Sequence, residues 1–254
     1  MKLKINIQFP EWIKGVTMKI KFVLVLLLTI ALFQCQSASH EWGYHGEHGP
    51  EHWGGTCQSG SSQSPVNIDH PSKSSPRPII FNYHSTAAKI LNNGETVKII
   101  FEPGNEIIVE GRTYALLQMH FHTPSEHTVG SQAQPIELHL VHKNQDGQLA
   151  VVGVFFKAGN RNAPLQSLWD KIPDTVNRED PAGNVDPSVF LPVERNYFAY
   201  SGSLTTPPCS EGVKWHVLKH PMEASAEQIA TFKKIVEMNA RPVQELNGRS
   251  VTEY

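Results

Sequence analysis

Several features that would assign a protein to a common functional class are scarce in this sequence. Positive charge is not in excess, because 22 basic residues face 24 acidic ones. No basic stripe is available for nucleic acid, so we expect no nucleic-acid partner. The apolar run at 22–33 is shorter than the roughly 20 residues that a membrane-spanning helix needs. Only three cysteines occur, without a Cys-x-x-Cys pair, which disfavours a cysteine-based zinc site.

The apolar run has the flanks of a secretory signal. Lys19 and Lys21 precede it, and the small residues 37–39 after it suit cleavage. We expect residues 1–39 to be an N-terminal extension with a signal peptide, starting at Met1 or Met18. The mature protein would be exported, periplasmic or secreted.

The cysteines fit this prediction. Gln34 precedes Cys35, whereas bacterial lipoprotein sites have a small residue there, so no lipid anchor is expected. If Cys35 leaves with the signal, Cys57 and Cys209 remain as a pair. In an exported protein that pair favours a disulfide, with two buried free thiols as the alternative. Such a disulfide would close a loop of about 150 residues and contribute about 4–5 kcal/mol in the chain-entropy model.

Turn residues dominate the rest of the chain. Eighteen glycines and eighteen prolines argue against a helical bundle. One helix is predicted from Asn162 to Pro173, and another begins at Ser225, where Gln228 completes a capping box. The strand-like runs are 79–83, 89–91, 97–101, 106–109, 114–122, 136–142 and 149–156. We predict a mainly β (α+β) fold: a single domain, 40–254, with a large, mostly antiparallel, twisted central sheet and a few peripheral helices.

Three histidines in two of these strands point to a metal. His120 and His122 are two residues apart, so in a strand their side chains leave the same face. His139 lies in the next strand-like run. Three neutral imidazoles with an open position form the ligand set of a catalytic zinc site. A pair of structural histidines, or a cupin-type metal site, is the alternative.

Two polar residues share these strand faces. Gln118 lies on the face of His120, and Glu137 on the face of His139. A metal-bound imidazole normally donates its second N–H to such an acceptor, which fixes its orientation. Glu137 could instead be a fourth ligand, but about 6–7 Å along one strand favours support over ligation.

Longer motifs surround the histidines in a characteristic order. They are His120–His127, Glu137–His142, Tyr200–Glu211, Trp42–Tyr44, Gly49–Trp53, Gln63–Pro65, Asn92–Gly94, Trp215 and Asn239–Gln244. This order resembles an α-class carbonic anhydrase of the bacterial, exported type. The resemblance extends from His40 to the C-terminus.

The resemblance implies a role for each matching residue. His120, His122 and His139 would bind one Zn²⁺ per chain. The Thr205 hydroxyl would accept a hydrogen bond from a zinc-bound hydroxide and donate one to Glu126. His127 and His142 match no ligand position, so they are taken as structural.

The resemblance also implies a substrate pocket and a reaction. Val141, Val151, Leu204 and Val213 would hold CO₂, and Thr206 would line the substrate side. The enzyme, a carbonate dehydratase, would hydrate CO₂ reversibly to bicarbonate and a proton. CO₂, bicarbonate and water would be its substrates, sulfonamides and anions its inhibitors, and a homodimer is compatible. The disulfide Cys57–Cys209 matches the bacterial members and would brace the loop of Thr205.

One position departs from the family pattern. Many members have a proton-shuttle histidine after the Asn-Asn-Gly turn, and Glu95 stands there. A carboxylate with a pKa of about 4.3 matches a donor near 7 less well than a histidine of about 6.5. We expect slower proton transfer through the region of Glu95, Tyr44 and Asn93, or a route that uses His45 or His48.

Two rival functions remain. The first is a non-catalytic binding protein of the same family, although such relatives have usually lost a zinc ligand. The second is a metal-sequestering protein, suggested by the histidine-rich segment 40–52. Ester hydrolysis would be a side reaction of the same site.

Overall fold

The computed structural model describes residues 42–254. The predicted signal peptide, Cys35 and the predicted domain boundary after residue 39 lie outside this range. Among the described residues, no helix is both long enough and apolar enough to cross a membrane.

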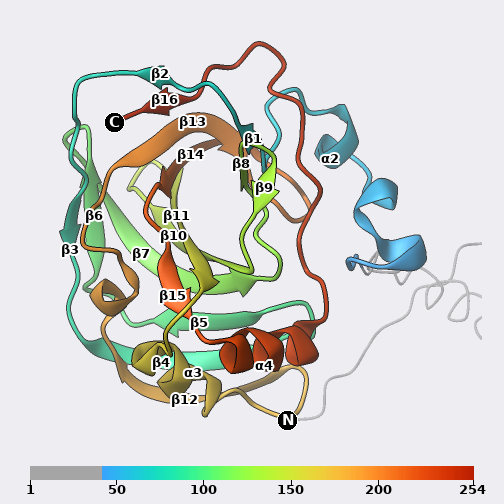
Figure 1. Cartoon of the computed structure of the whole chain (residues 1–254), viewed down its shortest axis with the longest axis vertical. Coiled ribbons are helices and arrows are strands. Elements are labelled where there is room, and N and C mark those ends of the chain that lie inside the picture. The colour runs from blue at the N-terminus through green and yellow to red at the C-terminus, as the bar shows by residue number, and fades with distance from the viewer. Residues whose placement is uncertain (1–41) are drawn as a thin grey trace, which may run out of the picture. The chain divides into compact units, whose positions relative to one another are not determined.

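A 13-stranded, strongly twisted sheet forms most of the described chain (Figure 1). Its main path runs β12-β4-β5-β7-β10-β11-β14-β13-β16-β2, while β3, β6 and β15 pair beside it. The parallel pairings are β11 with β14, β11 with β15 and β16 with β2. All other pairings of this sheet are antiparallel, as predicted. The strands of the sheet are β2 (Ser72–Lys73), β3 (Ile80–Asn82), β4 (Thr86–Asn92), β5 (Val97–Phe101), β6 (Glu106–Val109), β7 (Arg112–His122), β10 (Ile136–Lys143), β11 (Leu149–Ala158), β12 (Arg178–Val185), β13 (Tyr197–Ser203), β14 (Glu211–Leu218), β15 (Met222–Ala224) and β16 (Thr252–Glu253).

Short elements complete the described chain. A small sheet pairs β1, β8 and β9, and the segment before Trp53 forms tight 3-10 turns without a strand, as its glycines and prolines predict. The short elements are η2 (Gly46–His48), η3 (Pro50–His52), α2 (Thr56–Ser59), η4 (Pro187–Phe190), β1 (Asn67–Ile68), β8 (Thr128–Val129) and β9 (Gln132–Ala133).

The centre of the sheet is covered on both faces. β10 pairs with β7 on one side and with β11 on the other, and Ile136 to His142 are all buried. The run in β11 that is apolar on both faces is likewise a central strand. Strands of this kind are expected where both faces pack against protein.

Strand alternation divides β7 between two layers. Met119 and Phe121 enter the larger apolar core, and His120 and His122 leave the opposite face. Complete burial of a side chain such as Phe121 stabilises the fold by about 1.5–3 kcal/mol.

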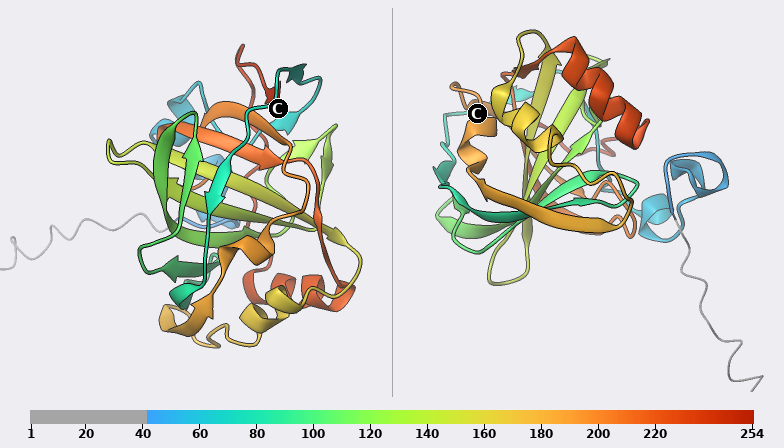
Figure 2. Two further views of the ribbon diagram at one scale, coloured as in Figure 1. Left: turned by 90° about the vertical axis from the view of Figure 1, so that its left-hand side faces the viewer. Right: turned by 90° about the horizontal axis from the view of Figure 1, so that it is seen from below.

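Two helices, α3 (Ala163–Trp169) and α4 (Ala226–Val236), cover that core. They lie beside each other at one end of the sheet, as the two rotated views confirm (Figure 2). The rings of Trp169 and Phe232 stack at 4.9 Å, and Phe121 meets Trp169 edge-on at the same distance. These helices therefore stabilise the back of β7, the strand that carries two of the histidines.

The helix starts were predicted correctly, but one end was not. The Asn162 side chain caps α3, and Ser225 and Gln228 form the predicted capping box of α4. α3 ends at Trp169 rather than at Pro173. The amides of the next residues bond three residues back, Lys171 N to Leu168 O among them, so the last turn tightens before Pro173.

Candidate metal centre

The three predicted histidines converge on one point. His139 of β10 stands opposite His120 of β7 in the antiparallel register, and His122 follows two residues later. The ring centroids of the three lie 4.6–5.3 Å apart. One nitrogen of each ring lies within 4.8 Å of the others. The fold thus brings histidines from two strands close enough to bind one metal ion.

Each ring is held through its other nitrogen. His120 Nδ1 lies 2.9 Å from Gln118 Oε1, and His139 Nε2 lies 3.0 Å from Glu137 Oε1. His122 Nδ1 lies 2.7 Å from the carbonyl oxygen of Asn239. Each acceptor oxygen requires the facing nitrogen to carry the proton. The lone pairs of His120 Nε2, His122 Nε2 and His139 Nδ1 therefore face the common point.

The orphaned atoms at that point fit a metal. His122 Nε2 and Glu126 Oε2 are buried and have no hydrogen-bond partner among residues 42–254. Glu126 Oε2 lies 3.5 Å from His122 Nε2 and 3.8 Å from His139 Nδ1. An unpaired buried polar group costs about 1–3 kcal/mol, so an arrangement of this kind calls for a bound group.

The pKa shifts of two of these histidines also suit a metal. Burial lowers the pKa of His120 well below its usual range, and the neighbouring His122 and His139 lower it further. Burial likewise lowers the pKa of His122, although Glu126 opposes the shift. Neutral imidazoles are the form that binds metal, and three nitrogen donors suit zinc.

Glu137 is a support and not a ligand in this arrangement. Its Oε1 faces His139 Nε2 and also lies 2.7 Å from His127 Nδ1, while its Oε2 accepts from the amides of Glu126 and His127. Burial alone would raise its pKa, but the charges and hydrogen bonds of His127 and His139 outweigh burial and hold the pKa far below the usual range. Gly153 provides the space that the Glu137 carboxylate occupies, because a Cβ at position 153 would lie 2.9 Å from Glu137 Oε1.

His127 and His142 make hydrogen bonds away from the point where the three histidines converge. His127 joins Glu137 to the Tyr200 hydroxyl, 2.7 Å from its Nε2. His142 Nε2 lies 2.6 Å from the Tyr83 hydroxyl. His127, Glu137 and His139 also lie close enough together to hold a metal. Their facing nitrogen and oxygen atoms, however, already form hydrogen bonds with one another.

The histidines lie in a cavity of about 220 Å³. Predicted residues that line it are Gln118, Val141, Val151, Leu204, Thr205, Thr206, Tyr44, Asn93 and Glu95, and further ones are Trp42, Thr96, Lys98 and Trp215. Val213 is not among the described lining residues. It is buried in the same apolar cluster as Val141 and Val151.

Thr205 and Glu126 are both buried near the triad. Glu126 Oε1 accepts a hydrogen bond of 2.9 Å from the backbone amide of Arg241. In the part of the chain that the structure describes, no hydrogen bond joins Thr205 to Glu126. The free Oε2 leaves an acceptor position open for a hydroxyl group.

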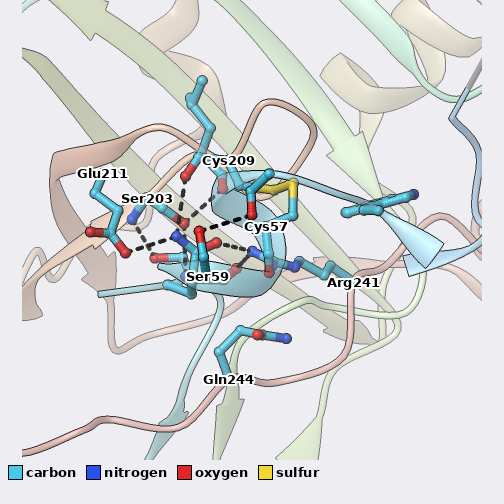
Figure 3. Close-up of a disulfide and its surroundings, with 12 residues drawn as sticks. Cys57, Ser59, Ser203, Cys209, Glu211, Arg241 and Gln244 are labelled. Carbon is cyan, nitrogen blue, oxygen red and sulfur yellow. Dashed lines mark hydrogen bonds between the residues drawn. A yellow bond between two sulfur atoms is a disulfide. The ribbon is translucent and has the colours of Figure 1, made fainter. Parts of the chain in front are cut away.

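A disulfide joins Cys57 to Cys209, as the cysteine count favoured (Figure 3). The loop around Cys209 carries Thr205 and Thr206. Within it, Cys209 N donates to Thr206 O, and Leu204 N donates to Ser210 O, each at 2.9 Å. The disulfide therefore anchors the loop next to the cavity.

The cavity rim holds Glu95. Asn93 Oδ1 accepts from the amides of Glu95 at 3.1 Å and Thr96 at 2.7 Å, which fixes the turn. Burial raises the pKa of the Glu95 carboxyl, and His45 partly offsets this. Burial lowers the pKa of Lys98, which also lines the cavity.

The model of the eukaryotic-type carbonic anhydrase family matches residues 48–254. The chain belongs to the α-carbonic anhydrases. Carbonic anhydrases of two bacteria are similar over most of their length. That of Pectobacterium carotovorum is 40% identical over 242 residues, covering 92% of this chain and 99% of that protein. That of Nostoc is 44% identical over 225 residues, covering 84% and 85%.

A solved structure agrees with this assignment. The α-carbonic anhydrase of Thermovibrio ammonificans, in complex with sulfanilamide, is 43% identical. It superimposes with a TM-score of 0.82 over 84% of this chain and 98% of that one. Carbonic anhydrases hydrate CO₂, so the histidine cavity is this enzyme's candidate active site.

The motif Asn239–Gln244 stood out in the sequence, but two of its residues were given no role in the site. Asn239 supplies the carbonyl that holds His122, and Arg241 supplies the amide that holds Glu126. Both contacts use backbone atoms of a segment more than a hundred residues away, so no side-chain pattern could reveal them.

Proposed function

We propose that this carbonic anhydrase is a zinc enzyme, with His120, His122 and His139 as ligands, that hydrates CO₂ reversibly to bicarbonate and a proton. The observation that supports it most is the convergence of three imidazoles on one buried point. Each ring is held by a hydrogen bond at the nitrogen that faces away from this point. When bound, zinc would supply a Lewis acid that makes water nucleophilic near neutral pH.

The apolar wall of the cavity suits CO₂. Val141, Val151 and Leu204 offer no hydrogen bonds, so they hold a small apolar substrate loosely beside the histidines. Thr206 adds a polar side chain to the same cavity. The attacking oxygen forms a bond to the CO₂ carbon, one C=O electron pair moves to oxygen, and the proton of water leaves through the cavity.

Thr205 and Glu126 would orient the attacking oxygen. The Thr205 hydroxyl would donate its proton to Glu126 Oε2, which has no other hydrogen-bond partner in the described chain. With its proton committed there, the hydroxyl oxygen accepts a hydrogen bond from the nucleophile. This fixes which lone pair points at CO₂.

The assay that tests the function is stopped-flow CO₂ hydration by the zinc-loaded protein. We expect rapid hydration. An aromatic sulfonamide such as sulfanilamide should abolish it, and the N-methylated analogue of that sulfonamide should leave it unchanged. Anions should inhibit more weakly. Hydration no faster than in buffer alone would contradict the proposal and favour a non-catalytic binding protein.

Glu95 is proposed to limit proton transfer out of the cavity. Its carboxyl lies at the rim, and a histidine has a pKa closer to that of the donor. Glu95→His should raise kcat about tenfold in weak buffer and leave it unchanged in concentrated buffer. A buffer titration in which Glu95→His equals the parent enzyme, or an equal gain in the exposed control Glu102→His, would refute this.

Export is proposed for the enzyme domain 40–254 after removal of residues 1–39, and the disulfide supports it, because disulfides persist in oxidising compartments. The alternative function, a metal-sequestering protein with a histidine-rich segment at 40–52, gains no support. Among residues 42–254, neither of the two groups that could hold a metal includes His45, His48 or His52.

A further inference from the structure

The Arg241 side chain has an unusual environment. It is only 3% exposed, yet no carboxylate pairs with its guanidinium in the described chain. Nη2 donates to Cys57 O at 2.8 Å, beside the disulfide (Figure 3). Nη1 donates to Gln63 Oε1 at 2.9 Å and to Ser64 O at 2.7 Å, and the guanidinium lies over the Trp53 ring, 5.7 Å from its centroid. Buried charges are normally paired. A guanidinium held by three neutral acceptors therefore needs an explanation.

The segment that carries this side chain touches the candidate metal site twice. The carbonyl of Asn239 accepts from His122 Nδ1, and the amide of Arg241 donates to Glu126 Oε1. The Asn239 side chain adds bonds to Thr123 N and Phe121 O, on either side of His122. Any shift of residues 239–241 would therefore move a ligand and Glu126 together.

The acceptors of the guanidinium are bonded to residues that flank the loop of Thr205. Cys57 is bonded to Cys209, and Gln63 Nε2 donates to Cys209 O at 3.2 Å. The Ser64 amide donates to Ser203 Oγ at 2.9 Å. Cys209 and Ser203 flank the loop of Thr205. The three acceptors are thus fixed to the loop that carries the hydroxyl.

We propose that the Arg241 guanidinium is a positioning residue that sets Glu126 and His122 relative to Thr205. It bridges the segment 239–241 to the anchored acceptors of Cys57, Gln63 and Ser64. The catalytic consequence rests on the proposed zinc function, whereas the effect on His122 can be measured as metal affinity alone.

Charge alone does not explain the arrangement. Burial lowers the pKa of the guanidinium, and Glu126 partly offsets this. A lysine would keep the charge, but its compact ammonium cannot reach three acceptors in the planar geometry of a guanidinium. Arg241→Lys therefore separates a role in geometry from a role in charge.

Arg249 offers a matched control. It also donates only to neutral oxygens, namely Leu246 O, Ser201 O, Gln63 O and Glu245 O, and lies over the Tyr200 ring at 5.7 Å. It bonds neither residues 239–241 nor Glu126, and it contacts Gln63 at the backbone carbonyl, whereas Arg241 uses the side-chain Oε1. Its loss should destabilise the fold without reaching the metal site.

The experiment compares Arg241→Gln, Arg241→Lys and Arg249→Gln. For each, zinc release to a chelator, kcat and KM for CO₂ hydration, and thermal unfolding are measured. Loss of a group that orients a ligand typically costs 10–100-fold. We expect both Arg241 variants to release zinc about tenfold faster and to lose about tenfold in kcat at unchanged KM. Arg249→Gln should lower only the unfolding temperature.

Three outcomes would overturn the proposal. Parent-like zinc release in Arg241→Gln would show that the guanidinium does not position His122. Full recovery in Arg241→Lys would assign the effect to charge. Equal losses in Arg249→Gln would make it a general stability effect. If Arg241→Gln does not fold, Gln63→Met keeps the guanidinium and removes one of its three acceptors. This variant should speed zinc release in the same direction, and parent-like release would then overturn the proposal. Absent hydration by the parent with altered zinc release in the variants would refute only the proposed function.

Discussion

Replacing His139 with alanine should abolish stoichiometric zinc binding and lower CO₂ hydration about a thousandfold. His139 is the proposed ligand from β10, and its loss leaves two imidazoles from β7. A catalytic metal contributes several kcal/mol of transition-state stabilisation, and about 4 kcal/mol corresponds to that thousandfold. The measurement combines bound zinc per chain with stopped-flow hydration.

A buried histidine of the same strand provides the control. His142 lies in β10 and bonds to the Tyr83 hydroxyl and to Ala150 O. His142→Ala should destabilise the fold but keep one zinc per chain. If His139→Ala retained the parent rate and zinc content, or if His142→Ala lost zinc equally, the assignment of the triad would be wrong.

Among the variants considered, removal of the disulfide should cause the largest loss of unfolding free energy. Cys57 and Cys209 are 152 residues apart, so the bond constrains a long loop of the unfolded chain. The double variant Cys57→Ser/Cys209→Ser should lose about 2–5 kcal/mol of unfolding free energy. Its kcat should also fall, because the loop that carries Thr205 loses an anchor.

Chemical denaturation with and without reductant measures this effect. Reductant should destabilise the parent to the level of the double variant and leave the double variant unchanged. A parent that is equally stable with its disulfide reduced would contradict the expected contribution. Unchanged kcat in the double variant would show that the Thr205 loop keeps its place without the disulfide.

The parts of this protein that were predictable depend on local pattern. Strand parity placed His120 and His122 on one face, and alternation placed Met119 and Phe121 on the other. The capping box at Ser225 is likewise local, because its two hydrogen bonds lie within one turn. The resemblance to a family extended these patterns to Thr205 and Glu126, which spacing alone could not have connected.

The parts that were missed depend on contacts across the chain. The carbonyl of Asn239 reaches His122 across 117 residues, and any residue type would present the same carbonyl. Arg241 reaches Cys57 across 184 residues. The early end of α3 depends on the tightening of one turn before Pro173.

The most direct test of the zinc assignment is the CO₂ hydration rate as a function of zinc bound per chain. Metal-free protein is titrated with zinc, and hydration is followed by stopped flow at each addition. The account predicts a linear rise that stops at one zinc per chain. Several bound zinc ions without hydration, or hydration that is independent of zinc, would contradict it.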